Sequence, residues 1–247
     1  MVERELLIDT ADGRMDTFLA YPDEECSYPV VLFYMDAPGI RGELFDMARR
    51  IAAEGYFVVL PNLYYREVRV SSEAYAETPL AERPAYARFI DNGLVMRDTA
   101  AMLAYVDHHP RANAASIAAL GYCMSGAFVF AAAGTYPERI RCAASVYGVN
   151  LVTDGDDSPH LLAAEVTGEL YFACAEHDEW VPGDVIPRLE ACLAEAAVNY
   201  RIEWYPGTRH GFAFADRADA YERDSAERLW DRLFDLFERN LAPAGGS

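Results

Sequence analysis

The segment Ser116-Ile-Ala-Ala-Leu-Gly-Tyr-Cys-Met-Ser-Gly-Ala-Phe128 passes from a β-type run of apolar residues into a helical one. Small residues, Gly121 and Ser125, stand two positions before and two positions after Cys123. This pattern is typical of a nucleophile elbow, a strained turn between a strand and a helix that holds a reactive side chain above the edge of a sheet. We therefore expect a buried strand that ends at Gly121 and a helix that begins after Cys123.

Strands and helices alternate on both sides of this segment. The expected strands are 3–8, 15–21, 29–34, 56–60, 116–121, 141–147, 170–175 and 200–205, and the expected helices are 43–54, 94–108, one after Cys123, 185–196 and 220–240. The first two strands flank the turn signal Asp12-Gly13 and predict an antiparallel hairpin. The third is apolar without alternation, as in strands buried on both faces. The sequence therefore predicts an α/β fold, with a doubly wound, mostly parallel sheet and helices on both faces.

The length of 247 residues suits one α/β domain over 1–247. Two stretches, 64–92 and 150–167, are long for simple connections. They are either cap elements over a pocket or ordinary surface excursions with a short helix. The tail 242–247 consists of small residues, and we expect it to be flexible.

The chain is strongly acidic. It carries 21 basic and 40 acidic residues, a net charge of −19, and every basic residue is Arg. Such a surface repels phosphate backbones and anionic membrane faces, which argues against nucleic acid or a membrane as a partner. The expected partner is a small molecule, and the chain is expected to be a monomer or a homodimer.

The five cysteines are odd in number and contain no Cys-x-x-Cys pair that would indicate zinc or a redox dithiol, so we expect a reducing compartment. The first five residues are charged, and no later apolar run reaches membrane-spanning length. These features predict a cytoplasmic protein without a metal site.

The elbow requires a base and an acid. A thiol at its tip is activated by the positive end of the following helix and by a neighbouring imidazole. Alone, Cys123 would more often be a buried apolar cysteine, but its position between a strand and a helix favours a nucleophile. The acid of such a site follows an earlier strand than the base. The strand 170–175 is followed by Asp178, and the strand 200–205 by His210. We predict a Cys123, Asp178, His210 triad.

Other ionisable residues compete for these roles. The alternatives are Glu176, Glu179, His108, His109, His160 and His177. The two glutamates follow the same strand as Asp178 and are alternative acids. His108 and His109 end a helix, where a cation complements the helix dipole. His160 lies in an irregular region and is a candidate for the lining of a pocket.

Five ordered motifs carry a resemblance to one family. They are Phe33-Tyr-Met-Asp-Ala-Pro-Gly39, Pro61-Asn-Leu-Tyr-Tyr-Arg66, Gly121-Tyr-Cys-Met124, Ala175-Glu-His-Asp178 with Val181-Pro182, and His210-Gly-Phe212. Over nearly its whole length the chain resembles the dienelactone hydrolase (carboxymethylenebutenolidase) family. The resemblance implies the α/β-hydrolase fold, a Cys-His-Asp triad, hydrolysis through an acyl-enzyme, and neither metal nor organic cofactor.

The resemblance also implies roles for residues around the nucleophile. Family members build the oxyanion hole from two backbone amides, which correspond here to Met124 and Ala37. A carboxylate at the position of Asp36, often Glu in the family, contacts the resting thiol and helps to deprotonate it when substrate binds. Asp36 is one methylene shorter, and its alternative role is to brace the oxyanion loop.

Family members that act on dienelactone hold its carboxylate with arginines, one of them four residues after the catalytic histidine. Phe214 stands at that position in this chain. Arg83 or Arg88 is a candidate for one contact and Arg217 for the missing one, with surface positions as the alternative for each. The further candidates for substrate binding are Tyr64, His160 and Phe212.

These observations together predict a hydrolase that cleaves a small ester or lactone. A broader carboxylesterase or thioesterase is the first alternative, because one arginine is missing and tyrosines and phenylalanines are abundant. The second is a catalytically slow, ligand-binding member of the fold, since thiol acyl-enzymes can hydrolyse slowly. A substrate panel distinguishes the first two, and an acyl adduct without turnover would indicate the third.

Overall fold

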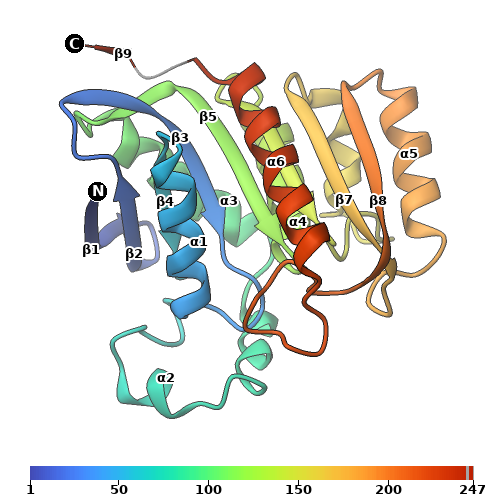
Figure 1. Ribbon diagram of the computed structural model, residues 1–247, viewed down its shortest axis with the longest axis horizontal. Helices are drawn as coiled ribbons and strands as arrows, with labels where there is room; N and C mark the ends of the chain where they lie inside the picture. The colour runs from blue at the N-terminus through green and yellow to red at the C-terminus, as the bar shows by residue number, and fades with distance from the viewer. Residues whose placement is uncertain (243–244, 247) are drawn as a thin grey trace. The chain divides into compact units, whose positions relative to one another are not determined.

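The computed structural model describes residues 1–242 and 245–246 (Figure 1). They group into two compact units, and each is described by itself. Unit 1 comprises 1–117 together with the described residues after 241, and unit 2 comprises 118–241. The expectation of a single domain stays a prediction. The flexible tail predicted over 242–247 falls partly on residues 243, 244 and 247, which lie outside the described residues.

Unit 1 contains the N-terminal strands. They are β1 (Val2–Thr10), β2 (Gly13–Tyr21), β3 (Cys26–Tyr34), β4 (Phe57–Pro61), the first part of β5 (Ala112–Tyr122), and the short β9 (Gly245–Gly246). The order is β1-β2-β4-β3, and β9 pairs with β3. β1 and β2 form the expected hairpin, in which Thr10 pairs with Gly13 across a two-residue turn. β2 and β4 are antiparallel, whereas β3 and β4 are parallel.

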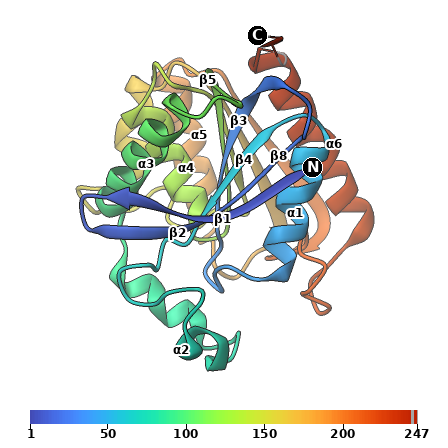
Figure 2. The same ribbon diagram turned by 90° about the vertical axis from the view of Figure 1, so that its left-hand side faces the viewer.

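The helices of unit 1 are α1 (Gly42–Ala53), α2 (Glu73–Glu77), the 3₁₀ helix η1 (Arg83–Phe89) and α3 (Asn92–Asp107). Figure 2 shows α1 and α3 on opposite sides of the strands of this unit. α3 begins where the Asp91 side chain accepts the amide of Leu94 at 2.7 Å, which caps its first turn. The long stretch 64–92 contains α2 and η1, and its function as a cap stays a prediction.

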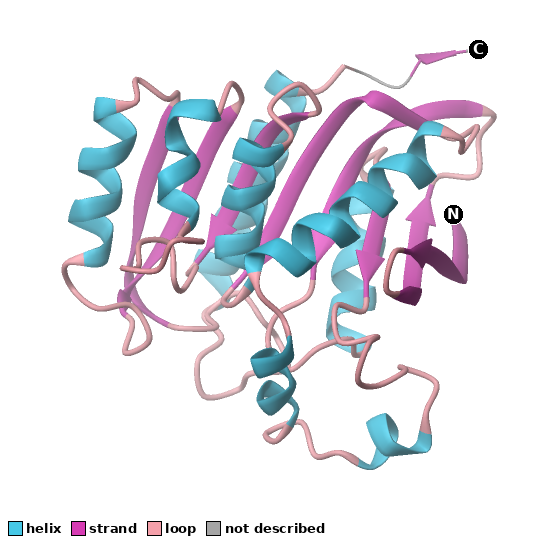
Figure 3. Ribbon diagram, turned by 180° about the vertical axis from the view of Figure 1, so that it is seen from behind, coloured by secondary structure: helices cyan, strands magenta, loops and turns pink. Residues whose placement is uncertain are grey.

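Unit 2 carries the remaining strands in the order β5-β6-β7-β8. They are β6 (Ile140–Val146), β7 (Glu169–His177) and β8 (Tyr200–Arg209), and β7 is parallel to both neighbours. The helices are α4 (Ser125–Thr135), the 3₁₀ helix η2 (Pro159–Glu165), α5 (Val185–Glu195) and α6 (Arg223–Asn240). α6 lies on one face of the strands, and α4 and α5 lie on the other (Figures 1 and 3). Parallel strands bring their carboxyl ends to one edge, where loops from several strands can form a site.

The predicted α/β fold, with a mostly parallel sheet and helices on both faces, is confirmed. The strand expected over 116–121 runs further, from Ala112 to Tyr122. α2, η1 and η2 lie inside the stretches that interrupted the alternation in sequence. Among the helices of the described residues, none combines the length and the apolar character needed to cross a membrane.

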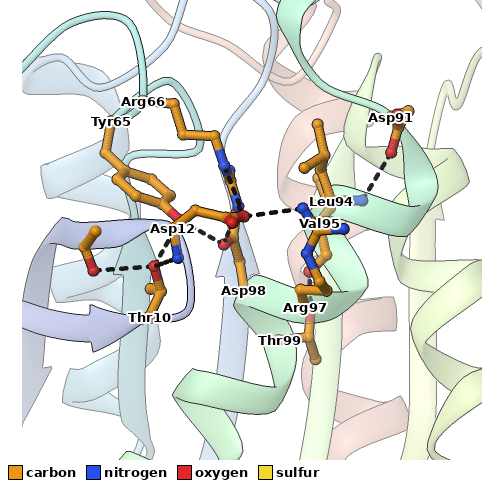
Figure 4. Close-up of polar contacts among 11 residues, drawn as sticks. Thr10, Asp12, Tyr65, Arg66, Asp91, Leu94, Val95, Arg97, Asp98 and Thr99 are labelled. Atoms are coloured by element: carbon orange, nitrogen blue, oxygen red, sulfur yellow. Dashed lines mark hydrogen bonds and ion pairs between the residues drawn. The ribbon is translucent and has the colours of Figure 1, made fainter.

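A buried ion pair joins α3 to the segment after β4 in unit 1 (Figure 4). The Asp98 side chain is fully buried, and its two oxygens accept from the Arg66 guanidinium at 2.7 and 2.9 Å. The Tyr65 hydroxyl donates to the same carboxylate at 2.9 Å. Burial raises the pKa of Asp98, and the hydrogen bonds from Arg66 oppose this effect. Asp98 therefore depends on Arg66 to remain charged.

We expect Arg66→Met to lower the free energy of unfolding by about 3 kcal/mol, because it leaves the Asp98 charge buried with fewer partners. Urea unfolding monitored by circular dichroism measures this loss. The matched control is Arg97→Met, because Arg97 is half exposed and pairs with Asp12 at the surface. A surface pair contributes less than about 1 kcal/mol. Equal losses in the two variants would contradict a structural role for the buried pair.

Candidate active site

Cys123 lies at the turn between β5 and α4. Its backbone has a φ of +55°, a left-handed conformation that is strained for a residue other than glycine. The Cys123 amide donates to the carbonyl of Val146 at 3.0 Å, and its carbonyl accepts from Gly126 at 3.0 Å and from Val149 at 3.1 Å. These three bonds hold the turn on the neighbouring strand end and on the first turn of α4. The side chain is half-buried.

The glycines around the turn are required by close backbone contacts. A Cβ atom at Gly121 would overlap the carbonyl group of Ser125, and one at Gly126 would overlap Gly148 and the Ser145 hydroxyl. The small residues therefore let α4 start directly above β5, as the sequence pattern predicted. The sequence pattern called for small residues only two positions before and two positions after Cys123. It did not include the requirement for glycine at position 126.

Gly121→Ala is expected to lower the free energy of unfolding by about 1–3 kcal/mol, because the added methyl forces the backbone at the start of α4 to move. The same movement displaces Cys123, so any activity that depends on its thiol should fall as well. Gly42→Ala is the matched control, since a Cβ atom there meets nothing within 4 Å. Urea titration and an activity assay of both variants test this. An unchanged Gly121→Ala protein would contradict the close contact.

The structure brings Cys123, Asp178 and His210 together within unit 2. Asp178 follows β7, and its carboxylate accepts from Nδ1 of His210 at 2.9 and 3.0 Å. His210 follows β8 and also forms a hydrogen bond with Cys123. Since Nδ1 faces Asp178, Nε2 is the ring nitrogen left for the thiol. The side chains of His210 and Asp178 are 9% and 7% exposed, so water competes little for this pair.

The pKa of His210 results from opposing effects of burial and of these contacts. Burial lowers it, but the hydrogen bonds to Asp178 and Cys123, together with the charges of both groups, outweigh burial and raise it from 6.5 to about 9. The ring is therefore protonated near neutral pH when its partners are charged. This arrangement favours a positively charged ring of His210 between Asp178 and Cys123.

The alternative acids and bases have other contacts. Glu176 accepts from the Gly207 amide at 2.6 Å and lies 3.7 Å from His177, and both are exposed. His108 caps α3 through the Ala104 carbonyl, and the ring of His109 packs between aromatic rings of unit 1. Of the acids at the end of β7 or after it, Asp178 is the one that contacts His210.

Two aromatic residues beside the triad were missed in the sequence. The ring of Tyr147 lies 5.0 Å from that of His210, and its backbone has a φ of +37°. The exposed Trp180 has its ring 6.3 Å from that of His210, and its amide donates to Asp178 at 3.0 Å. Tyr147 directly follows the end of β6, and Trp180 lies two residues after Asp178; these positions were the available signal.

Asp36 and Ala37 lie in unit 1, in the loop after β3. Asp36 is fully buried, and its carboxylate accepts from the Arg41 guanidinium at 2.5 and 3.2 Å. Its carbonyl also accepts from the Gly39 amide. The Tyr64 hydroxyl donates to the Ala37 carbonyl at 2.7 Å. These contacts brace the loop, and a contact of Asp36 with the thiol stays a prediction.

The other candidate substrate residues of unit 1 have partners of their own. The Arg83 guanidinium donates to the carbonyls of Thr78 and Tyr75 and lies 4.1 Å from the Tyr75 ring centre. The guanidinium of Arg88 lies 4.5 Å from the ring centre of Phe89. These contacts of both arginines therefore lie within the segment 75–89.

The remaining candidates belong to unit 2. Nδ1 of His160 contacts the Ser158 hydroxyl at 2.6 Å, within the segment of η2. Phe212 is fully buried and packs on Tyr147 and Tyr205. Arg217 lies next to Gly211, the residue that follows His210. Within the part of the chain that the structure describes, no group of three or more His, Cys, Asp and Glu side chains could hold a metal ion.

Comparisons with known proteins agree with this architecture. A Synechocystis protein named "Putative carboxymethylenebutenolidase" is 26% identical over 227 residues, which cover 91% of each chain. A Bradyrhizobium protein named "Probable 2-oxo-3-(5-oxofuran-2-ylidene)propanoate lactonase" is 25% identical over 219 residues, covering 87% of this chain and 85% of that protein.

Solved structures show the same fold. A "Putative Dienelactone Hydrolase" from Klebsiella pneumoniae has a TM-score of 0.86 at 21% identity, with coverage of 96% of this chain and 98% of that chain. A dienelactone hydrolase-like promiscuous phosphotriesterase from metagenomic libraries has a TM-score of 0.79 at 17% identity, with coverage of 98% and 100%. The α/β-hydrolase fold is thereby confirmed. The sequence also matches the dienelactone hydrolase family over residues 15–241, and the chain therefore belongs to the dienelactone hydrolase family.

Proposed function

We propose that the chain hydrolyses a small ester or lactone through a Cys123, His210, Asp178 triad and a covalent acyl-enzyme. One observation carries this proposal: His210 is hydrogen-bonded to Asp178 on one side and to Cys123 on the other, at a strained turn that starts α4. Membership of a hydrolase family and the names of the relatives support the ester or lactone bond as the target.

In the acylation step, the Cys123 thiolate attacks the carbonyl carbon of the substrate. The electron pair of the carbonyl moves to its oxygen, and the amide of Met124, at the start of α4, stabilises this oxyanion. A second donor, the Ala37 amide, stays a prediction. When the oxyanion collapses, the carbon–oxygen bond to the leaving group breaks, and the His210 imidazolium gives its proton to that oxygen. In a lactone, the leaving oxygen remains part of the same molecule.

Deacylation requires His210 to act as a base. Once Cys123 is acylated its negative charge is gone, and the pKa of His210 falls because one of the contributions that raised it is lost. The neutral ring can then take a proton from water, whose oxygen attacks the thioester. The acid is released and Cys123 leaves as thiolate. The charge on Cys123 thus switches His210 between its acid and base roles.

The contacts of the arginines favour a substrate without a negative charge. Arg83 donates to backbone carbonyls, Arg88 lies against Phe89, and Phe214 replaces the arginine found in dienelactone-cleaving relatives. A carboxylesterase or thioesterase that accepts neutral acyl groups is therefore the second candidate. Rates on an anionic enol-lactone, a neutral aryl ester and an acyl thioester compare the two, and a preference of tenfold or more, about 1.4 kcal/mol, decides between them.

The acyl-enzyme is tested by intact-protein mass spectrometry after rapid acid quenching of a reaction with a neutral aryl ester. We expect an added acyl group that peptide mapping assigns to Cys123, appearing and decaying at the rate of turnover. An adduct that persists without turnover would indicate a ligand-binding protein instead. Turnover with no adduct, or with an adduct on another residue, would contradict the proposed nucleophile.

A further inference from the structure

A cavity within unit 2 is lined in part by Asp178. It has a volume of about 260 Å³ and is lined by residues at the ends of β6 and β7, the loop 181–183, α5 and β8. Its apolar lining residues include Leu151, Phe172, Val181, Pro182, Ile186 and Trp204. A smaller cavity of about 150 Å³ can already hold benzene. The space therefore suits a molecule with one aromatic ring and a short substituent.

The polar residues that line this cavity give it a negative charge. Glu176 and Asp178 both line it, and none of the lining residues, all in the described part of the chain, is basic. Trp204 is half exposed and offers the type of ring that attracts cations most strongly. Ser145 also lines the cavity and is 2% exposed, and its hydroxyl has no hydrogen-bond partner within the described residues. Two carboxylates and an indole favour a positive charge and disfavour a negative one.

These properties indicate that the cavity does not bind the product of hydrolysis. Hydrolysis of an ester or lactone leaves a carboxylate, which the two acidic side chains would repel. Cys123 and His210 are not among the lining residues. The cavity is therefore suited to a molecule other than the product of the reaction.

Asp178 connects the cavity to the triad. Its Oδ1 accepts from His210 and from the Trp180 amide, and its Oδ2 accepts from His210. A carboxylate has about four acceptor positions, so Asp178 can accept one further hydrogen bond. A donor placed there would draw negative charge away from His210 and weaken the contact that keeps its ring protonated.

We propose that the cavity lined by Trp204, Glu176 and Asp178 binds a small aromatic molecule that carries an ammonium group, and that the bound molecule reduces hydrolysis through Asp178. The aromatic ring packs among the apolar side chains, and the ammonium group lies between the two carboxylates. The binding site stands independently of the catalytic mechanism, whereas the effect on activity rests on the proposed function.

Three probes of similar size and different charge test the binding: benzylamine, benzyl alcohol and benzoate. Isothermal titration calorimetry is performed on the Cys123→Ala protein, so that failure of the hydrolase mechanism does not affect the result. We expect benzylamine to bind about tenfold more tightly than benzyl alcohol, from a partly exposed ion pair and a cation–π contact. Benzoate should not bind. Equal affinities for all three, or no binding of benzylamine, would overturn the proposal.

Two pairs of variants locate the bound molecule. Ile186→Trp fills the cavity from α5 and should abolish benzylamine binding, whereas Ala191→Trp, at an exposed position of the same helix, should leave it unchanged. Glu176→Gln should weaken benzylamine binding about threefold, and Glu179→Gln, outside the cavity, should not. Binding that survives Ile186→Trp would place the molecule elsewhere and overturn the proposal.

The effect on activity is measured with the unmodified enzyme and a neutral aryl ester. Saturating benzylamine should lower kcat without raising KM, and should move the alkaline fall of activity to lower pH, because the pKa of His210 drops. Ile186→Trp should remove both effects. An increase in KM alone would show competition with substrate and would overturn the proposed action through Asp178, even if the binding results hold.

Discussion

Cys123→Ala is expected to lower kcat/KM for a small ester by about 10⁴-fold or more, because the remaining groups of a triad give little catalysis without the nucleophile. The substitution removes only the sulfur atom. Alanine keeps the Cβ atom at this left-handed position, so the strain of the turn is the same in both proteins. The variant should therefore fold normally and bind substrate. Steady-state kinetics with an aryl ester, together with a urea titration, measure both properties.

The control for this variant is Cys192→Ala, which removes another half-buried thiol of the same unit. The Cys192 thiol donates to the carbonyl of His160, away from the triad. Its loss should change activity less than twofold, about 0.4 kcal/mol. If Cys123→Ala retained full activity while folding normally, the thiol would not be the nucleophile, and the proposed mechanism would be wrong.

The fold was predictable because its central strands differ from the others in sequence. The run 29–34 lacks alternation, and β3 is buried from Tyr28 to its end at Tyr34. The elbow was predictable for a similar reason: the start of α4 can approach the backbone at position 121 only because Gly121 has no side chain. Such signals are local. They arise from burial and backbone space within a few residues of each position.

The directions in which individual charged side chains point were not predictable. Asp36 was expected either to meet the thiol or to brace its loop, and nothing in the sequence indicated its bidentate pair with Arg41. Arg83 and Arg88 were candidates for a substrate carboxylate, yet both contact their own segment. The direction of a long side chain depends on which acceptors the folded chain presents, and that information is not in the local pattern.

The choice of Asp178 among neighbouring acids also depended on the folded structure. Sequence order placed an acid at the end of β7, and Glu176, Asp178 and Glu179 all stand within the last residues of this strand or directly after it. Only the folded loop distinguishes them: Glu176 turns to the Gly207 amide, whereas Asp178 turns to the His210 ring. The order of the three candidate residues was thus predictable from the sequence, whereas the contact between Asp178 and His210 depends on how the end of β7 lies against the end of β8.

Asp178→Asn is expected to lower kcat/KM by about 10²–10⁴-fold and to change the pH dependence of the reaction. In the native protein the pKa of His210 is about 9, so the ring is protonated below that pH and can give a proton to the leaving oxygen. As the pH rises through about 9 this proton is lost and activity should fall. Asparagine keeps the shape of the side chain but removes the charge, so the pKa of His210 should drop and the alkaline fall should begin nearer 6.5.

The raised pKa of His210 also makes the stability of the protein depend on pH, and this stability falls at alkaline pH as activity does. His210 contributes stability that is fully present below its unfolded value of 6.5 and is lost as the pH rises through about 9. Asp178→Asn should remove most of this pH-dependent contribution, because the partner charge is absent. Glu179→Gln, which removes an exposed charge next to Asp178, should leave both profiles unchanged. If Asp178→Asn lowered activity but left the alkaline fall near 9, Asp178 would orient the ring of His210 without setting its pKa, and the thiolate of Cys123 would be the group that holds the proton on the imidazole.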